Sequence, residues 1–161
     1  FYTYFGGKEH LLVALAVDFK HDVGRRFASI EVKNRVLPEL MRDLVACYWD
    51  AYVANAPVLA GIHQAAATSR EVADTWRGLR ADSRRQLTES IEFMQARGHG
   101  LGVDADAASS ALCAMMDGFC RTWIVGGGEV DRETIERDVA IDTLTAIWYR
   151  TVAFRAEGEI R

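Results

Sequence analysis

The sequence is patterned for helices from one end to the other. Only two of its 161 residues are proline, Pro38 and Pro57, and no segment alternates apolar and polar residues as a half-buried strand does. Alanine, leucine, arginine and glutamate, which dominate the long stretches, all favour helices. Half of the residues are apolar, enough to bury a core in a chain of this length. The sequence therefore predicts one all-α unit.

Turn signals divide this pattern into about six helices. The first is expected over residues 7–30, with an apolar row at every fourth residue from Leu11 to Phe27 and with Leu12 and Ala16 beside that row. The second is expected over 35–54. A short third helix follows Pro57. The sequence TSRE at 68–71 is predicted to be a capping box that begins the fourth helix, which ends near 97–102. The fifth begins near Asp104 and stops at 126–128. The sixth is expected to be capped by Asp131 and to reach about residue 154.

Charge and composition exclude several classes of protein. The net charge is -4, which argues against DNA binding by the body of the chain. No apolar run is long enough for a membrane span, and the start does not resemble a signal peptide. Three cysteines without a Cys-x-x-Cys pair are expected to be free thiols, which indicates a cytoplasmic protein.

The residues that support catalysis or metal binding are scattered. The four histidines show no metal-ligand spacing with one another or with cysteine, and no Gly-x-Ser-x-Gly turn is present. Gly98, Gly100 and Gly102 follow no strand, so they are not a nucleotide-binding loop. We expect no enzymatic activity, no metal and no cofactor.

The opening residues, FYTYFGGKEHLL, gather groups that bind phosphate. Tyr2 and Tyr4 carry hydroxyl groups, Lys8 carries a positive charge, and a helix N-terminus follows at once. These are common donors to the DNA backbone. The structural alternative is a capped helix start with two aromatic residues packed on the core.

The same stretch resembles the end of the helix-turn-helix in tetracycline-repressor (TetR) family regulators. The family pattern is an aromatic run, two spacer residues and a Lys-Glu-x-Leu helix start. Its matching residues here are Phe1, Tyr2, Tyr4, Phe5, Gly6, Gly7, Lys8, Glu9 and Leu11. The resemblance implies that Tyr2, Tyr4 and Lys8 contact DNA, whereas Phe1 and Phe5 pack the DNA-binding head onto the first helix.

The resemblance also implies a domain organisation. Residues 1–6 would end the helix-turn-helix domain, 7–30 would form a linking helix, and 31–161 would bind ligand and dimerise. The rest of the DNA-binding domain would lie before Phe1, so this chain alone is not expected to bind an operator. Residues 64–76 are similar to actinobacterial members of the family with long apolar ligand tunnels.

A sensor of this kind needs a pocket between its helices. Apolar candidates for its walls are Leu40, Leu44, Cys47, Trp76, Leu87, Met94, Met116, Phe119 and Trp148. The alternative for any one of them is ordinary core packing, because an aromatic stripe at helical spacing belongs to a core more often than to a pocket. Asp117 lies in the apolar stretch CAMMDGFC, where a carboxyl group needs a partner or a cavity. It either lines the pocket or faces solvent or a partner subunit.

The last two helices are candidates for a dimer interface. Small residues on the fifth helix permit close approach of another helix, and the sixth has a second apolar side. The expected function is therefore that of a homodimeric, ligand-responsive repressor, which a small hydrophobic ligand releases from operator DNA. The alternative is a carrier that sequesters a small apolar molecule and has no role at DNA.

Overall fold

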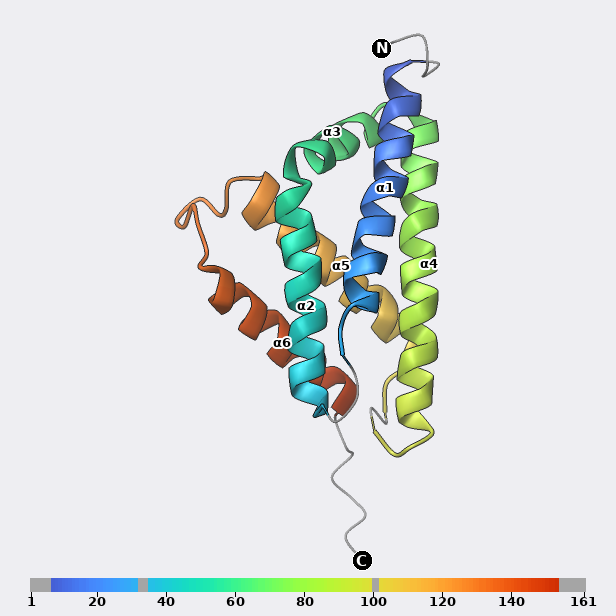
Figure 1. Cartoon of the computed structure of the whole chain (residues 1–161), viewed down its shortest axis with the longest axis vertical. Coiled ribbons are helices and arrows are strands. Elements are labelled where there is room, and N and C mark those ends of the chain that lie inside the picture. The colour runs from blue at the N-terminus through green and yellow to red at the C-terminus, as the bar shows by residue number, and fades with distance from the viewer. Residues whose placement is uncertain (1–6, 32–34, 100–101, 154–161) are drawn as a thin grey trace, which may run out of the picture.

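The computed structural model describes residues 7–31, 35–99 and 102–153, and most of them are helical (Figure 1). Within these ranges there is no β-strand; Glu129 and Arg132 form one isolated bridge. The prediction of an all-α fold with about six helices is confirmed. The helices are α1 (Lys8–Ala28), α2 (Leu37–Ala54), α3 (Ala56–Ala66), α4 (Arg70–Gln95), α5 (Ala105–Cys120) and α6 (Arg137–Ala153), with a π-helical segment, Arg121–Val125, directly after α5.

Three long helices, α1, α2 and α4, lie lengthwise in the bundle, with α1 between the other two (Figure 1). α3 crosses one end and packs on both α1 and α4. α5 passes behind α1 and packs along α4, while α6 lies obliquely against α2. α1 therefore contacts α2, α3 and α4. A displacement of any of these three helices would act on α1 directly.

The buried face of α1 differs from the predicted row of every fourth residue. The buried residues are Leu12, Ala16, Phe19 and Val23. Leu11 is only half-buried and Phe27 is 36% exposed, so the prediction was wrong at both ends of the helix. Because an α-helix has 3.6 residues per turn, a row of every fourth residue drifts round it by about 40° per step. Steps of four, three and four residues keep one face toward the core.

Short polar side chains begin two of the helices. Asp104 accepts a hydrogen bond from the Ala107 amide at 2.8 Å and is the N-cap of α5, whose start near Asp104 was predicted. At α4 the prediction was wrong by one residue, because Ser69 and not Thr68 is the N-cap. The amide groups of Thr68 and Ser69 both bond to the Ala65 carbonyl, at 3.0 and 2.7 Å, so Thr68 still belongs to the end of α3.

The predicted start of α6 was also wrong. Asp131 lies exposed in a tight turn, in which the Glu129 and Arg132 backbones exchange hydrogen bonds of 2.8 and 3.1 Å. Gly128 precedes this turn with φ +90°, and the chain folds back so closely that a Cβ there would lie 2.4 Å from the Glu133 carbonyl oxygen. The helix consequently begins at Arg137, after the turn is complete.

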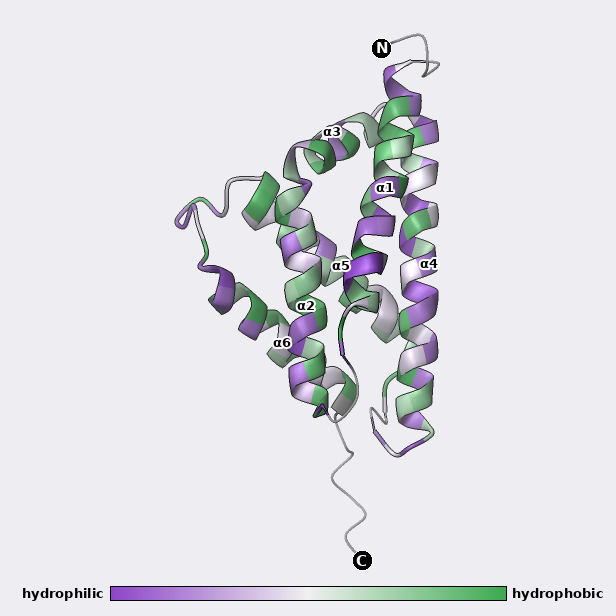
Figure 2. Ribbon diagram, viewed as in Figure 1, coloured by the Kyte–Doolittle hydropathy of each residue, from purple (hydrophilic) through white to green (hydrophobic). Residues whose placement is uncertain are grey.

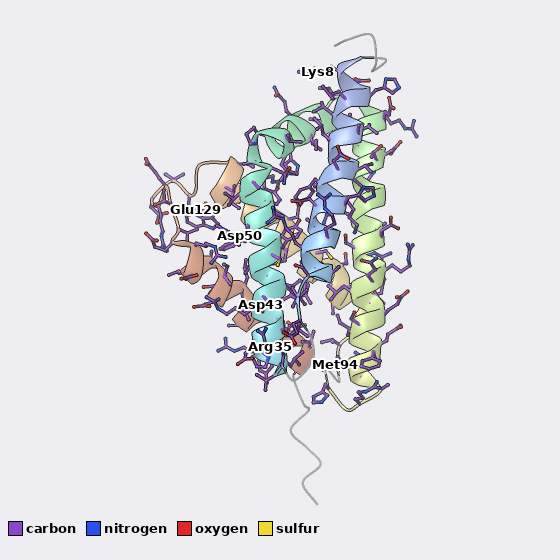
Figure 3. All side chains as sticks on the ribbon, in the orientation of Figure 1. Lys8, Arg35, Asp43, Asp50, Met94 and Glu129 are labelled. Carbon is purple, nitrogen blue, oxygen red and sulfur yellow. The ribbon has the colours of Figure 1, made fainter. Side chains whose placement is uncertain are left out.

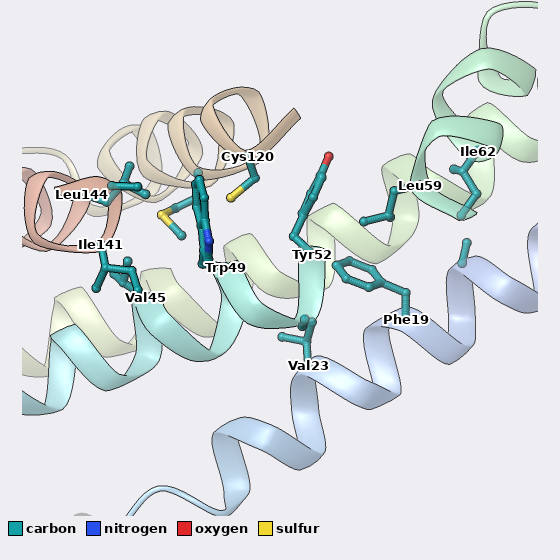
Figure 4. Close-up of a cluster of buried hydrophobic side chains, with 14 of the residues drawn as sticks. Phe19, Val23, Val45, Trp49, Tyr52, Leu59, Ile62, Cys120, Ile141 and Leu144 are labelled. Carbon is teal, nitrogen blue, oxygen red and sulfur yellow. The ribbon is translucent and has the colours of Figure 1, made fainter. Parts of the chain in front are cut away.

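The core consists of two clusters. The larger one joins α1, α2, α3, α5 and α6, with Phe19, Tyr52 and Leu59 at one end and Ile141 and Leu144 at the other (Figure 4). The smaller one lies where α2, α4, α5 and α6 meet, around Met41, Ile91, Ala105, Ala108, Leu112 and Val152. α4 contributes little to either cluster and carries hydrophilic residues along much of its length (Figure 2).

Ion pairs join α2 to α6 on the outside of the bundle. Arg137 donates two hydrogen bonds, of 2.8 and 2.6 Å, to the carboxylate of Asp50. Asp50 lies on α2 and is labelled in Figure 3. Arg42 donates to Asp142 at 2.7 Å and lies 3.4 Å from Asp138. All these side chains are solvent-exposed to a large degree, so each pair adds little to the stability of the fold. Together they fix one side of α6 against α2.

Candidate ligand-binding site

An aromatic cluster lies in the middle of the bundle. Phe19 of α1 meets two tyrosines of α2, with ring centroids 6.3 Å from Tyr48 and 6.0 Å from Tyr52, both edge to face. On its other side Phe19 stacks on Trp76 of α4 at 6.1 Å. His63 of α3 completes the cluster, 5.4 Å from Trp76. Four different helices thus supply the rings of one site.

Polar groups are buried within this cluster. The Tyr52 hydroxyl and Nε2 of His63 lie 2.8 Å apart, and their rings stack. Asp117 of α5 is only 8% exposed, and its Oδ1 atom has no hydrogen-bond partner among the described residues. An unpaired buried oxygen is uncommon in a folded protein, because losing water without a replacement hydrogen bond is unfavourable.

The environment shifts the acid–base properties of these groups. Burial raises the pKa of Tyr48 and of Tyr52 well above the usual value, and the nearby charge of Asp117 raises both further. Burial lowers the pKa of His63; Asp117 opposes this effect, and the positive charges of Arg121 and Arg80 add to it. The two tyrosines and the histidine are therefore neutral at pH 7.

A small cavity of about 40 Å³ opens beside the cluster, between α1, α2 and α4. Its walls are Phe19, Val23, Tyr48, Trp76 and Leu79, and its polar rim is Lys20, Arg80 and Ser83. The Lys20 ammonium group donates to the Ser83 hydroxyl, and burial lowers the pKa of Lys20. The cavity has room for one or two water molecules, whereas sites for drug-sized ligands occupy about 300–1,000 Å³. A larger ligand must displace wall side chains.

The structure brings some of the predicted ligand residues together. Trp76 lines the cavity, and Asp117 lies in the buried polar cluster. Met116, Phe119 and Trp148 pack in the same large core cluster as Trp76. Phe119 lies between Trp49 and Trp123, with centroid distances of 6.2 and 6.0 Å.

The other predicted ligand residues lie elsewhere. Leu87 packs against the smaller core cluster. Leu40, Leu44 and Cys47 are half-buried on α2, where the Cys47 thiol lies 3.9 Å from the Arg26 carbonyl oxygen. Met94 is half-buried near the end of α4 (Figure 3). None of these five lines the cavity.

Four residues of the aromatic cluster were not among the predicted ligand residues. They are Phe19, Tyr48, Tyr52 and His63. Tyr48 and Tyr52 are four residues apart on α2, a spacing that places both on one face and that was available from the sequence. His63 gave no such signal, because its partners Tyr52 and Trp76 come from other helices.

A π-helical segment follows the site. Asp117 and Cys120 lie in the last turn of α5, and Arg121–Val125 then widens into a π-helix that the Gly126 amide closes by bonding to the Arg121 carbonyl at 2.8 Å. Such segments are rare, and those that do occur are often found at functional sites. A π-helical turn holds more residues than an α-helical turn does. Here the segment begins four residues after Asp117 in the sequence.

A separate apolar groove of about 550 Å³ runs along α5 and α6. Its lining is mostly small or aliphatic: Val103, Asp104, Ala107, Ala108, Ala111, Leu112, Met115, Ile147 and Thr151. Val139 and Ile147 of α6 are 48% and 42% exposed. These two helices are the ones from which the sequence predicted a dimer interface.

The remaining predictions concern membranes, metals and DNA. Among the described residues no helix is both long and apolar enough to span a membrane, and no group of three or more potential ligands could hold a metal ion. Lys8 is the exposed first residue of α1 (Figure 3). Tyr2 and Tyr4 lie outside the described residues.

The fold and the site together define a helical bundle with a central aromatic site and an apolar outer groove. A family model described as the C-terminal domain of the transcriptional regulator EthR matches residues 41–153. The chain therefore belongs to this family of TetR-type transcriptional regulators. This confirms the resemblance found in the opening residues.

Solved structures agree with this family. A bacterial regulatory protein of the tetR family from Rhodococcus RHA1 is 19% identical, with a TM-score of 0.70, over 94% of this chain and 77% of that one. A protein of unknown function from Rhodococcus sp. RHA1 is 20% identical, with a TM-score of 0.63, over 93% of this chain and 77% of that one. At identities this low, the two solved structures show a shared fold and nothing more specific. Among curated protein sequences none matches this chain.

Proposed function

We propose that this chain is the ligand-sensing and dimerising part of a repressor, which a small apolar ligand releases from its operator. The observation that carries the proposal is the aromatic cluster around Phe19. Through this residue α1, the first long helix, itself forms part of the wall of the site. Phe19 is 5% exposed and contacts rings from α2 and α4. A ligand that separates these rings has to move α1.

Movement of α1 is the proposed link to DNA. Lys8 begins α1, and we propose that it contacts the DNA backbone together with Tyr2 and Tyr4, as the family resemblance implies. In a dimer, two copies of α1 would set the spacing of the two DNA-binding heads. Two half-sites on DNA require a fixed separation, so a ligand that binds one placement of α1 better shifts the population of molecules able to bind.

We propose that the dimer forms through α5 and α6, along the apolar groove. Small side chains such as Ala107 and Ala111 allow a helix of the second copy to approach closely. Exposed Val139 and Ile147 would be covered in the same interface. Another side of α6 forms the ion pairs with α2. The side that carries Ile147 is therefore left for a partner.

The test compares DNA binding with ligand binding in the intact regulator. Fluorescence anisotropy would measure its affinity for the DNA segment upstream of its own gene, with and without octan-1-ol as an apolar probe. The proposal expects specific binding that the probe weakens. Substituting Tyr2→Ala with Lys8→Ala should weaken binding to all DNA sequences alike and leave probe binding unchanged. Probe binding without any effect on DNA affinity would indicate a carrier instead.

A further inference from the structure

One oxygen atom in the centre of the bundle lacks a hydrogen bond. Asp117 is 8% exposed, and within the described part of the chain no donor bonds to its Oδ1 atom. A buried carboxyl oxygen without a partner destabilises the ligand-free protein, so an incoming donor at this point gains more than it would in water. This oxygen is therefore the natural anchor for the polar end of a ligand.

The neighbouring side chains do not supply that donor. The Tyr52 hydroxyl interacts with the Asp117 carboxyl group and lies 2.8 Å from Nε2 of His63, but it leaves Oδ1 of Asp117 without a hydrogen bond. The charge of Asp117 nevertheless acts on Tyr48, Tyr52 and His63, so all three lie close to it. Of these three residues, Tyr48 also lines the cavity, so it lies between the cavity and the Asp117 carboxyl group.

The charges around the site favour a neutral donor over a cation. Arg80 and Arg121 both act on His63 from nearby, and Lys20 and Arg80 lie at the rim of the cavity. The Asp117 carboxylate would attract an ammonium group, but these three positive charges outnumber it and would repel that group, whereas a hydroxyl group or an amide N–H carries no net charge. The aromatic and aliphatic walls suit an apolar remainder.

We infer that the ligand of this site is an apolar molecule with a neutral hydrogen-bond donor, a hydroxyl or N–H group, that bonds to Oδ1 of Asp117. The inference rests on the proposed ligand-sensing function and adds the chemical class of the ligand. Its polar end reaches Asp117 past Tyr48, and its apolar part separates Phe19 from Trp76. The donor therefore selects the ligand, and the apolar part moves α1.

A pair of isomers isolates the donor. Octan-1-ol and 1-methoxyheptane contain the same atoms, but only the alcohol can donate a hydrogen bond. Titration calorimetry should show that the unsubstituted chain binds octan-1-ol about tenfold more tightly than the ether, since a hydrogen bond to a charged group typically stabilises by at least that factor. Octylammonium, which adds a positive charge, should bind more weakly than octan-1-ol.

Two substitutions locate the effect at Asp117. Asp117→Leu removes the acceptor at similar volume and should reduce the preference for the alcohol to less than about twofold. Asp117→Asn adds an amide donor and should raise the affinity for the ether, so that the two isomers bind alike. Asp18→Leu, which removes an exposed carboxylate of α1, is the matched control and should keep the tenfold preference.

The outcomes separate this inference from the proposed function. Equal binding of the two isomers by the unsubstituted chain would overturn the inference while an apolar ligand site remained. A preference that survives in Asp117→Leu, or tightest binding of octylammonium, would also overturn it. If none of the three probes binds, both the inference and the ligand-sensing function are contradicted.

Discussion

The Tyr52 hydroxyl and Nε2 of His63 lie 2.8 Å apart in the centre of the bundle, which joins α2 to α3 across the break at Asn55. Tyr52 is fully buried and His63 is half-buried, so water replaces neither partner easily. This contact holds α3 over the aromatic cluster and orients His63 toward Trp76, 5.4 Å away.

Removing the hydroxyl group tests this contact. Tyr52→Phe should lower the free energy of unfolding by about 1–2 kcal/mol, because it leaves a buried ring nitrogen without a partner. Urea denaturation measures the change. Tyr149→Phe, at an exposed position of α6, should change stability by less than about 0.5 kcal/mol. Equal effects of the two substitutions would contradict the structural role of the hydroxyl.

The stability of the domain should depend on pH through His63. Burial lowers the pKa of His63 from its usual 6.5, so the unfolded chain takes up this proton at a higher pH than the folded chain does. The contribution of this residue is therefore fully present above pH 6.5 and decreases as the pH falls below it. Urea denaturation at pH 7.5 and at pH 5.0 should show the loss, and His63→Gln should reduce it. An identical pH dependence in the variant would exclude His63 as its source.

The turn before α6 gives a matched pair of glycines. Gly127 and Gly128 both have positive φ, +80° and +90°, but a Cβ at Gly127 meets nothing within 4 Å, whereas one at Gly128 meets the Glu133 carbonyl oxygen at 2.4 Å. Gly127→Ala should destabilise by about 1–2 kcal/mol, the usual difference for a left-handed residue. Gly128→Ala should destabilise more, since the backbone must shift as well. Thermal denaturation that ranks the two in the opposite order would contradict the fold of this turn.

The proposed dimer predicts sensitivity to charge in the apolar groove. Ile147→Glu places a carboxylate there and should weaken self-association by roughly a hundredfold or more, because burying an unpaired charge is strongly unfavourable. Analytical ultracentrifugation over a range of protein concentrations measures this. Val53→Glu, at a 51% exposed position of α2, should leave association unchanged. A dimer that persists in Ile147→Glu would place the interface elsewhere.

The sequence predicted local features of the fold well. Helical periodicity and the two prolines located the helices, and the start of α5 was placed correctly near Asp104, because these signals act over a few residues. The prediction that Asp131 caps α6 was wrong, because a backbone turn decides where this helix begins. In that turn the chain at Gly128 comes close to the backbone of Glu133. A polar residue near a possible helix start therefore does not by itself determine where the helix begins.

The candidate site was only partly predictable. Asp117 was singled out because a carboxyl group in an apolar stretch needs an explanation, and the structure finds it buried with an unpaired oxygen. Trp76 was also chosen, and it lines the cavity. Tyr52 and His63 were not predicted as site residues, because what places them in the site is their contact with each other across two helices. The domain boundaries and the ligand roles stay predictions until binding is measured.

The helix α2 contributes to both halves of the molecule. Its inner side supplies Tyr48 and Tyr52 to the aromatic cluster, and its outer side holds α6 through Asp50 and Arg42. If a ligand tilts α2, it also moves α6, and ligand binding and subunit association become thermodynamically linked. The link is reciprocal, so the apparent affinity for the ligand would then vary with the concentration of the protein itself. Because exposed ion pairs weaken in salt, ionic strength would tune how strongly the two events are coupled.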